Sequence, residues 1–478
     1  MKSLVCFSSI SLSDPVLHGE QVAAQVTLDP IDGHQTTFPL QLRYPEPLHE
    51  RQRPIIRMAC CMPLLNYGLF TTHLHLDFPI CKADSALLHD FHLAFSRDIY
   101  VNRLISGTND YLLPPYIPRD VSPQAAEPRA DIQVRDVTAD MLLTGDLDAQ
   151  RCGILSSGGK ESLLTYGLLN EIGAETYPLY VNESGGHWRT ALTAYRHHRD
   201  SDSHTMRVWT NVDRFYVFML DHLPFIRSDH RDVRADAYPI RLCIFPHYIF
   251  TLLPLFMEHG IGNLLMGSEF DDWREKPVFQ GIPHYHSIYD QHQDFDIRMN
   301  QWYQARMPGL RQWSALRGIT GLIVERILFQ RYPPLARLQR SCHSCHFENG
   351  DVMPCGVCSK CYGVLLFLLA NGIDPTLVNY TPGQIASFQE KVSMDTLRLD
   401  IDEALHSLHL LGYPEGQYVE HVEQMHLCED TCSPRLVPAR YRKPLLDVID
   451  AYISGYCTLH QGEWVPAPDG AARSLTIR

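Results

Sequence analysis

The fold of this chain is decided by the stretch Ile154-Leu155-Ser156-Ser157-Gly158-Gly159-Lys160-Glu161-Ser162. Its first residues are apolar and predict a strand, and the amphipathic segment from Ser162 to Ile172 predicts a helix. The two glycines between them allow a tight turn, so that amide groups at the helix start face outward toward an anion. Together with the serine hydroxyls and the positive charge of Lys160, this loop is expected to bind phosphate or pyrophosphate.

The spacing of this loop differs from the Walker pattern, because Gly-x-x-x-x-Gly-Lys-Ser/Thr is absent. A serine-glycine turn that only caps a helix is the simpler alternative. The loop resembles the Ser-Gly-Gly-x-Asp-Ser signature of the PP-loop ATP pyrophosphatases, which split ATP between the α and β phosphates. For ATP binding, the resemblance implies Ser156, Ser157, Gly158, Gly159, Lys160 and Ser162. For catalysis, it implies Ser157, Lys160, Glu161 and Ser162.

One departure from that signature is Glu161, which keeps the acidic charge of the family's aspartate on a longer side chain. A second strand, from Tyr177 to Val181, is expected to end at Asn182, and in the resembling family this strand end faces the adenosine. The stretch from Asn263 to Asp272 has the form of another strand that leads into an acidic loop. The resemblance therefore implies nucleotide contacts by Asn182 and Gly267.

Four segments are expected along the chain. Residues 1–112 read as an N-terminal α+β domain and the proline-containing residues 113–145 as a linker. Residues 146–375 carry the phosphate loop, and there strand and helix signals alternate as they do in a parallel sheet covered by helices. Residues 376–478 read as a helical extension. The predicted class is α/β, with a parallel sheet of the PP-loop, Rossmann-like kind and flanking helices.

The cysteines are distributed unevenly. Five of the 14 lie between Cys342 and Cys361, which favours a metal site in a reducing cytoplasm over a disulfide framework. The stretch Cys355-Gly356-Val357-Cys358-Ser359-Lys360-Cys361 places three thiols three residues apart, a spacing that suits tetrahedral zinc. An iron-sulfur cluster is the alternative. The fourth ligand is open between Cys342 and Cys345, with His343 and His346 as further candidates.

The phosphate loop and the cysteine knuckle of residues 342–361 together resemble the 7-cyano-7-deazaguanine synthase (QueC-like) family. The resemblance covers roughly residues 150 to 375. It matches Ser341-Cys342 to a Ser-Cys pair of the family, and Cys355, Cys358 and Cys361 to the triplet that follows. Cys342 thereby becomes the preferred fourth zinc ligand, with Cys345 as the alternative.

Substrate contacts are expected from two further stretches. Glu269, Asp271 and Asp272 are candidates for holding magnesium or recognising a base edge, and a solvated acidic loop is the alternative. Tyr289 and Asp290 are loose counterparts of a Tyr-Pro-Asp-Cys-Arg stretch of the family, whose proline, cysteine and arginine are missing here. For the histidines His187 and His247, ordinary polar packing is the expected role.

The net charge and the hydropathy of the chain argue against nucleic acid as a partner, against a signal peptide and against a membrane-spanning helix. The net charge of -14 argues against a surface that neutralises many phosphates, so nucleic acid is a poor first choice. The N-terminus lacks the sustained apolar core of a signal peptide. The apolar stretches Leu242–Met257 and Tyr362–Ala370 are shorter than the ~20 residues of a membrane-spanning helix, so both are expected to be buried core elements.

The resemblance implies an AMP-forming ligase that uses ATP and magnesium to adenylate 7-carboxy-7-deazaguanine, after which an amine attacks the adenylate. Ammonia as the amine gives an amide and then a nitrile. The chain is enlarged on both sides of the shared domain, as in relatives from bacterial anti-phage systems that join the deazapurine to the amino end of a partner protein. That protein conjugation is the leading hypothesis, and a homodimer stays open.

Three alternative functions remain at this point. The chain could be a 7-cyano-7-deazaguanine synthase that uses ammonia, or an enzyme that adenylates tRNA for thiolation. The acidic balance and the lack of a basic, aromatic-rich stretch count against the tRNA enzyme. The third alternative is a module that binds nucleotide without turnover and acts in assembly or sensing.

Overall fold

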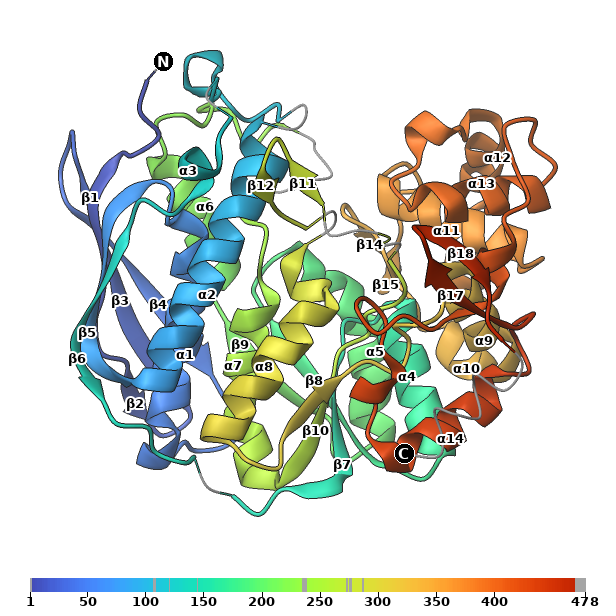
Figure 1. Cartoon of the computed structure of the whole chain (residues 1–478), viewed down its shortest axis with the longest axis horizontal. Helices are drawn as coiled ribbons and strands as arrows, with labels where there is room; N and C mark the ends of the chain where they lie inside the picture. The colour runs from blue at the N-terminus through green and yellow to red at the C-terminus, as the bar shows by residue number, and fades with distance from the viewer. Residues whose placement is uncertain are drawn as a thin grey trace.

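The structure is a computed structural model that describes residues 2–105, 109–119, 121–143, 145–233, 239–271, 274, 277–285 and 288–468. Within these residues the main feature is an 11-stranded sheet with the order β13-β10-β7-β8-β9-β4-β3-β1-β5-β6, in which β2 pairs with β3 (Figure 1). Helices flank the sheet, which confirms the α/β class predicted from the alternating strand and helix signals.

Five parallel strands build the half of the sheet that carries the phosphate loop. They are β7 (Asp148–Leu155), β8 (Glu175–Asn182), β9 (Met206–Thr210), β10 (Ile261–Leu265) and β13 (Arg311–Trp313). Their order in space is β9-β8-β7-β10-β13, so the chain adds strands first on one side of β7 and then on the other. In such sheets the loops that follow the two central strands diverge, and a crevice opens at their carboxyl ends.

Helices cover both faces of this parallel half. Helices α4 (Lys160–Glu171) and α5 (Gly186–Ser201) pack on one face, and α7 (Phe245–His259) and α8 (Gln293–Arg306) pack on the other. Helix α7 is apolar on nearly all sides and buried, as expected for this stretch. Its Phe256 ring packs directly on Gly153 of β7. A Cβ at Gly153 would lie only 2.4 Å from this ring, so the close approach requires glycine.

The other half of the sheet comes from the N-terminal part of the chain. Its strands are β1 (Phe7–Leu12), β2 (Val16–His18), β3 (Gln21–Pro30), β4 (Thr36–Arg43), β5 (Thr71–Cys81) and β6 (Asp131–Thr138). Along β3 buried and exposed residues alternate, which marks a strand with one covered and one solvated face. Helices α1 (Arg53–Cys61) and α2 (Lys82–Ile99) share the core on the covered side (Figure 1).

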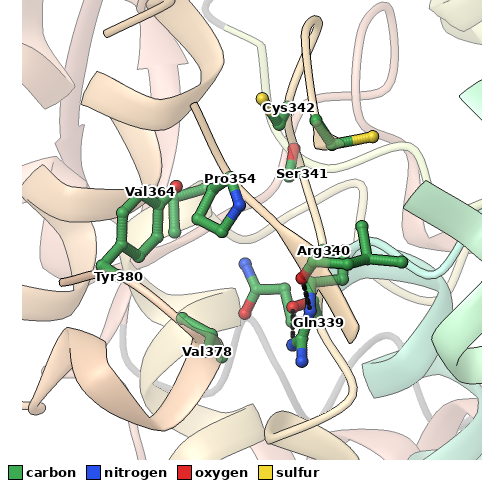
Figure 2. A pocket seen from close by; sticks show the side chains of 10 residues that line it. Gln339, Arg340, Ser341, Cys342, Pro354, Val364, Val378 and Tyr380 are labelled. Carbon is green, nitrogen blue, oxygen red and sulfur yellow. Dashed lines mark hydrogen bonds between the residues drawn. The ribbon is translucent and has the colours of Figure 1, made fainter. Parts of the chain in front are cut away.

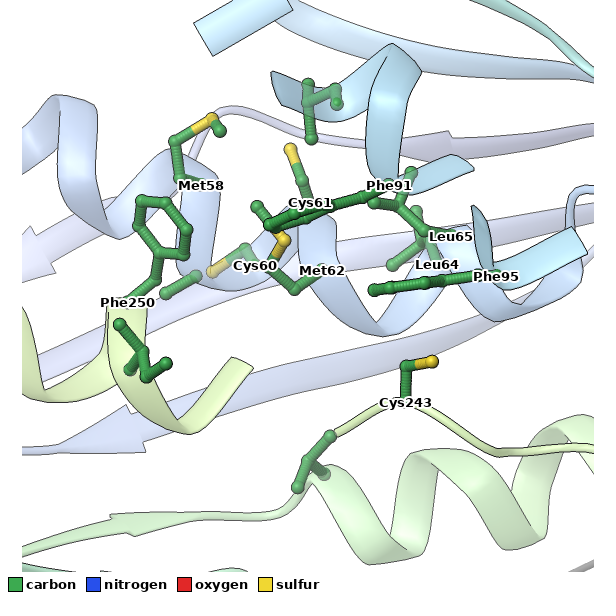
Figure 3. Close-up of a cluster of buried hydrophobic side chains, with 14 of the residues drawn as sticks. Met58, Cys60, Cys61, Met62, Leu64, Leu65, Phe91, Phe95, Cys243 and Phe250 are labelled. Carbon is green, nitrogen blue, oxygen red and sulfur yellow. The ribbon is translucent and has the colours of Figure 1, made fainter. Parts of the chain in front are cut away.

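One hydrophobic core joins the N-terminal strands to α7 and α8. Figure 3 shows part of it, where side chains of α1 and α2 meet Phe250 of α7. The rings of Phe91 and Phe95 stack with centroids 5.5 Å apart. Strand β6 lies inside the segment 113–145, which we predict as a linker from its prolines and the polar and small residues around them. The positions of the domain boundaries stay a prediction.

The two halves of the sheet meet where β4 pairs antiparallel with β9. Asn211, which is 5% exposed, follows β9, and its side-chain amide makes two hydrogen bonds to the backbone of β4. The Gln41 amide donates to Asn211 Oδ1 at 2.8 Å, and Asn211 Nδ2 donates to the Pro39 carbonyl at 2.7 Å. This side chain therefore completes the hydrogen bonding of the junction.

The C-terminal part of the chain packs against α4 and β13. Its helices are α9 (Gly321–Arg331), α11 (Ser359–Ala370), α12 (Pro382–Lys391), α13 (Ile401–Leu410) and α14 (Ala439–Ile449). The predicted helical extension also contains a small sheet that the sequence does not reveal, made of β16 (Met425–His426), β17 (Tyr456–His460) and β18 (Glu463–Pro466).

Short elements complete the described part. They are α3 (Pro123–Ala126), α6 (Val212–His222), α10 (Pro333–Ala336), β11 (Val278–Phe279), β12 (Ile282–Pro283), β14 (His346–Glu348) and β15 (Asp351–Met353). Among the residues that the structure describes, no helix combines the length and the apolar character needed to cross a membrane.

The junction between the sheet halves can be tested with Asn211→Ala. This change removes two part-buried hydrogen bonds to the backbone of β4. At about 0.5–1.5 kcal/mol for each bond, the free energy of unfolding should fall by about 1–3 kcal/mol. Urea denaturation measures the loss, with the exposed Gln417→Ala as the control. Equal stability of the two variants would contradict a role for Asn211 at the junction.

Candidate functional site

The predicted phosphate loop lies at the point where the strand order reverses. Residues 156–159 follow β7, and residues 266–271 follow its neighbour β10, so both loops lie at the carboxyl edge of the sheet. A Cβ at Gly267 would lie 2.7 Å from Glu161 Cβ, a distance that no side chain tolerates. Gly267 thus lets the second loop lie directly on the first turn of α4.

Hydrogen bonds between residues of the phosphate loop and the first turn of α4 shape the loop. The Ser157 amide donates to Ser162 Oγ at 3.4 Å, and the Gly159 amide donates to Ser157 Oγ at 3.3 Å. Gly158 adopts a φ of 76°, which favours glycine. Gly159 is the N-cap residue of α4 and has no side chain that could cap the helix, so the first turn of the helix is of the kind that binds anions.

Lys160 is the first residue of α4 and is held by two carboxylates. Its Nζ donates to Glu161 Oε1 at 2.5 Å and to the two oxygens of Glu269 at 2.8 and 2.7 Å. An ammonium group has three donors, so these contacts use its full capacity. The side chain of Lys160 is 9% exposed, whereas those of Glu161 and Glu269 are 29% and 27% exposed.

The charges in this cluster are strongly coupled. Burial acts to lower the pKa of Lys160, but Glu161 and Glu269 outweigh burial and raise that pKa above its usual value. Burial acts to raise the pKa of Glu161, and Lys160 holds it below the usual value. Burial raises the pKa of Glu269 to about 7, although Lys160 acts in the opposite direction. The single ammonium charge therefore favours the ionised form of Glu161, whereas burial and the charge of Glu161 still raise the pKa of Glu269.

Two more glutamates surround this cluster, and the sequence analysis missed both. Glu325 lies on α9, is fully buried and accepts a hydrogen bond from Gln339 Nε2 at 3.1 Å. Glu403 lies on α13 and accepts one from the Leu322 amide at 2.8 Å. Burial raises the pKa of each to about 8. No motif surrounds either residue, so only the packing of α9 on α4 and of α13 on α11 reveals them.

The end of β8 lies at the same edge of the sheet. Asn182 Oδ1 accepts a hydrogen bond from the Ser184 amide at 3.0 Å, which shapes the turn that follows the strand. The next residue, Glu183, is buried and accepts one from the Trp188 amide at 2.8 Å. Burial, followed by the charge of Asp213, raises the pKa of Glu183 to about 7. The structure thus brings Asn182 to the predicted edge, and its contact with nucleotide stays a prediction.

His187 and Lys360 approach the phosphate loop from the starts of two other helices. Burial lowers the pKa of His187 well below its usual value, and the charges of Lys360 and Arg241 add to this effect. Lys360 follows the knuckle residue Cys358 on α11 and lies close enough to interact with the charge of Glu161. Lys360 lies beside the phosphate loop only because the cysteine knuckle packs against that loop. The sequence alone does not show this packing.

The acidic loop after β10 is held by the C-terminal extension. Phe270 stacks on His426 of β16, with ring centroids 3.5 Å apart and planes 8° apart. Arg274 forms an ion pair with Asp402 of α13. Asp271 lies beside Glu269 and interacts with its charge. The predicted substrate residue Asp272 lies outside the described residues.

Tyr289 and Asp290 have structural contacts with α2 and α7. Tyr289 is buried among aromatic rings, with Phe91 5.9 Å away between centroids. Asp290 Oδ2 accepts hydrogen bonds from the Ile244 and Phe245 amides at 2.8 and 2.9 Å, and so caps α7. These contacts account for both residues, and a substrate contact by either of them stays a prediction.

His247 is a packing residue, as the sequence analysis expects. It lies on α7 and is 1% exposed. Its Nδ1 donates to the Ala59 carbonyl at 2.8 Å, and burial lowers its pKa to about 4. The imidazole is therefore neutral and joins α7 to α1.

The four expected cysteines form one cluster. The sulfur atoms of Cys342, Cys355, Cys358 and Cys361 all lie within 4.8 Å of one another, and two of the pairs are 3.9 Å apart. A tetrahedron with metal–sulfur bonds of about 2.3 Å has edges of about 3.8 Å. These four cysteines could therefore hold a metal ion such as zinc, and Cys345 lies outside the group.

Backbone donors support this metal centre. The amides of Ser344 and Cys355 donate to Cys342 Sγ at 3.3 and 3.2 Å. Such bonds stabilise a thiolate and orient it toward a metal. Of the two candidate histidines, His346 lies on β14, where its side chain is exposed and faces Glu348. The first cysteine of the cluster is thus Cys342, which is also the residue that the family resemblance favours.

The knuckle is attached directly to the phosphate loop. The Arg340 amide donates to the Gly158 carbonyl at 3.0 Å, two residues before the first cysteine of the cluster. Figure 2 shows how Gln339, Arg340 and Cys342 follow one another along a cavity of about 10 Å3 that Tyr380 and Val378 close. This cavity has room for about one water molecule, so the knuckle packs tightly here.

No family model matches the sequence, and no curated protein matches it. The resemblance to the PP-loop and QueC-like families therefore depends on the phosphate loop and the cysteine knuckle alone.

The metal centre predicts different outcomes for neighbouring cysteines. Replacing Cys342, Cys355, Cys358 or Cys361 by serine should lower the metal content of the purified protein, because each change removes one of four thiolates. Cys345→Ser is the matched control and should keep the metal. Elemental analysis measures both. Retention of a full metal equivalent by Cys342→Ser together with its loss in Cys345→Ser would contradict the assignment.

Proposed function

We propose that this protein is an ATP-dependent, AMP-forming ligase that adenylates 7-carboxy-7-deazaguanine, or a closely similar acid, and transfers it to an amine. The observation that carries this proposal is a glycine-rich anion loop with Lys160 at the sheet reversal, docked on a four-cysteine knuckle. The reversal point of an open α/β sheet is the usual place for nucleotide ligands. The pairing of loop and knuckle is the feature that resembles the QueC-like family.

The residues of the site suit the first reaction step. The amides of the loop and the hydroxyls of Ser157 and Ser162 are donors for phosphate oxygens. The substrate carboxylate attacks the α phosphorus, the bond from that phosphorus to the bridging oxygen breaks, and pyrophosphate leaves. Lys160 neutralises charge that grows on the departing group. Magnesium, for which Glu161 and Glu269 are ligands of the preferred type, would add further charge neutralisation.

In the second step an amine attacks the acyl carbon of the adenylate, and AMP leaves as the carbon–nitrogen bond forms. We propose the amino end of a partner protein as the acceptor, because the chain is enlarged on both sides of the shared domain. Its C-terminal extension contacts the loop after β10 through His426 and Asp402, next to the site. Ammonia is the acceptor in the alternative 7-cyano-7-deazaguanine synthase.

A tRNA-modifying enzyme and a silent nucleotide-binding module would each behave differently. An enzyme that adenylates tRNA for thiolation would bind tRNA at moderate salt, which the net charge of -14 opposes. A catalytically silent module would bind nucleotide without releasing pyrophosphate. Release of pyrophosphate that depends on the added carboxylate would exclude this module.

The central test omits the acceptor amine. With ATP, magnesium and 7-carboxy-7-deazaguanine, the protein should accumulate the acyl adenylate, which mass spectrometry identifies. Lys160→Met should reduce its formation by about 100-fold or more, the scale expected when a charge that stabilises a transition state is lost. Zinc content should stay unchanged in this variant. Loss of both would mean that Lys160 serves folding, and wild-type protein without any adenylate would overturn the proposed function.

The ion pairs of Lys160 predict an unusual gain in binding. Because Glu269 occupies two of the three donors of Lys160, Glu269→Gln should free the ammonium group for phosphate oxygens. We expect metal-free pyrophosphate to bind about tenfold more tightly, which corresponds to about 1.4 kcal/mol. Titration calorimetry measures the change, and Glu171→Gln at the far end of α4 is the control. Weaker binding by Glu269→Gln would contradict this competition.

A further inference from the structure

Strand β6 forms an open edge of the central sheet. It pairs parallel with β5 on one side, and no strand in the described part of the chain pairs with its other side. Figure 1 shows β6 at the margin of the sheet, far from the knuckle and the C-terminal helices. An edge strand presents free amide and carbonyl groups, which can pair with a strand of another chain.

The sequence of β6 is complementary to itself. It begins Asp131-Ile132-Gln133-Val134-Arg135. When two copies pair antiparallel about a two-fold axis at Gln133, Asp131 of each copy lies opposite Arg135 of the other. Ile132 then lies opposite Val134, and the two Gln133 residues face each other. Opposite charges at directly opposed positions stabilise an antiparallel pair, as do β-branched apolar residues.

Neighbouring registers lack this match. A shift of the axis to Arg135 places the two Arg135 side chains opposite each other, and a shift to Ile132 places Arg129 opposite Arg135. Both put like charges together, which destabilises the pair. With the axis at Val134, Arg135 meets Gln133 and both charges lose their partner. An axis between two residues would bring side chains of opposite faces together, which the strand period forbids.

The charged side chains at this edge are available for such a pair. Asp131 and Arg135 are both exposed, and within the described residues neither takes part in an ion pair. Gln133 Nε2 donates to Asp131 Oδ2 at 3.1 Å and so holds that carboxylate on the edge. Beyond the strand, Met141 and Leu142 are 68% and 56% exposed.

We infer that the β6 edge is a docking surface for a second copy of this chain, which joins two central sheets into one. Its occupant follows from the charge complementarity of the strand with itself. An isologous contact of this kind closes after two copies, so the product is a dimer. Pairing along one strand buries less surface than a standard interface, and we therefore expect a micromolar dissociation constant. This inference does not depend on the proposed function.

The test uses charge reversal in the full-length protein. Sedimentation equilibrium at up to about 200 μM, well above a micromolar dissociation constant, should show a dimer for the natural sequence. Asp131→Arg places Arg opposite Arg, and Arg135→Asp places Asp opposite Asp, so each variant alone should be monomeric. An equal mixture of the two should form a heterodimer, because every opposed pair is then Arg with Asp. The double variant should also dimerise.

Asp77→Arg on the neighbouring strand β5 is the control, since it changes the charge of the same exposed sheet face without touching the edge. It should leave the dimer intact. Three results would each overturn the inference: a monomer for the natural sequence at the highest concentration, a dimer for Asp131→Arg alone, or no heterodimer in the mixture. Circular dichroism confirms that the variants are folded.

Discussion

The close approach of the loop after β10 to the first turn of α4 is the constraint on which the site depends. Gly267 touches Glu161 so closely that no larger residue fits. The contact places Glu269 beside Lys160, and the two carboxylates then neutralise an ammonium group that would otherwise be buried without a partner. The ammonium group of Lys160 thereby lies at the N-terminal end of α4, where the helix dipole also favours the binding of anions.

The parts of the chain outside the parallel strands stabilise this arrangement from different sides. The knuckle is anchored to the phosphate loop through the Arg340 amide, so that a metal bound by the cysteines also supports the loop. The C-terminal extension packs against the loop after β10 through the stacked rings of Phe270 and His426. The N-terminal strands continue the same sheet through the junction at Asn211, and their core reaches α7 behind the site.

The sequence allowed much of the fold and part of the site to be predicted, because these features are local. A strand, two glycines and a helix within one short stretch specify an anion loop, and thiols three residues apart specify a knuckle. The resemblance to a known family also favoured Cys342 over Cys345, and Cys342 is the one that lies in the sulfur cluster. The prolines before β6 suggested a linker, but pairing with β5 is a long-range interaction that composition does not encode.

The sequence by itself therefore determined the chemistry of the loop and of the knuckle, since both depend on neighbours along the chain. Only the tertiary structure decided which distant side chains surround Lys160. Glu269 reaches it from another loop, and Glu325 and Glu403 come from helices of the C-terminal half. The physical reason is that burial and charge coupling arise from packing, and no periodicity or spacing in the sequence records which helices will pack together.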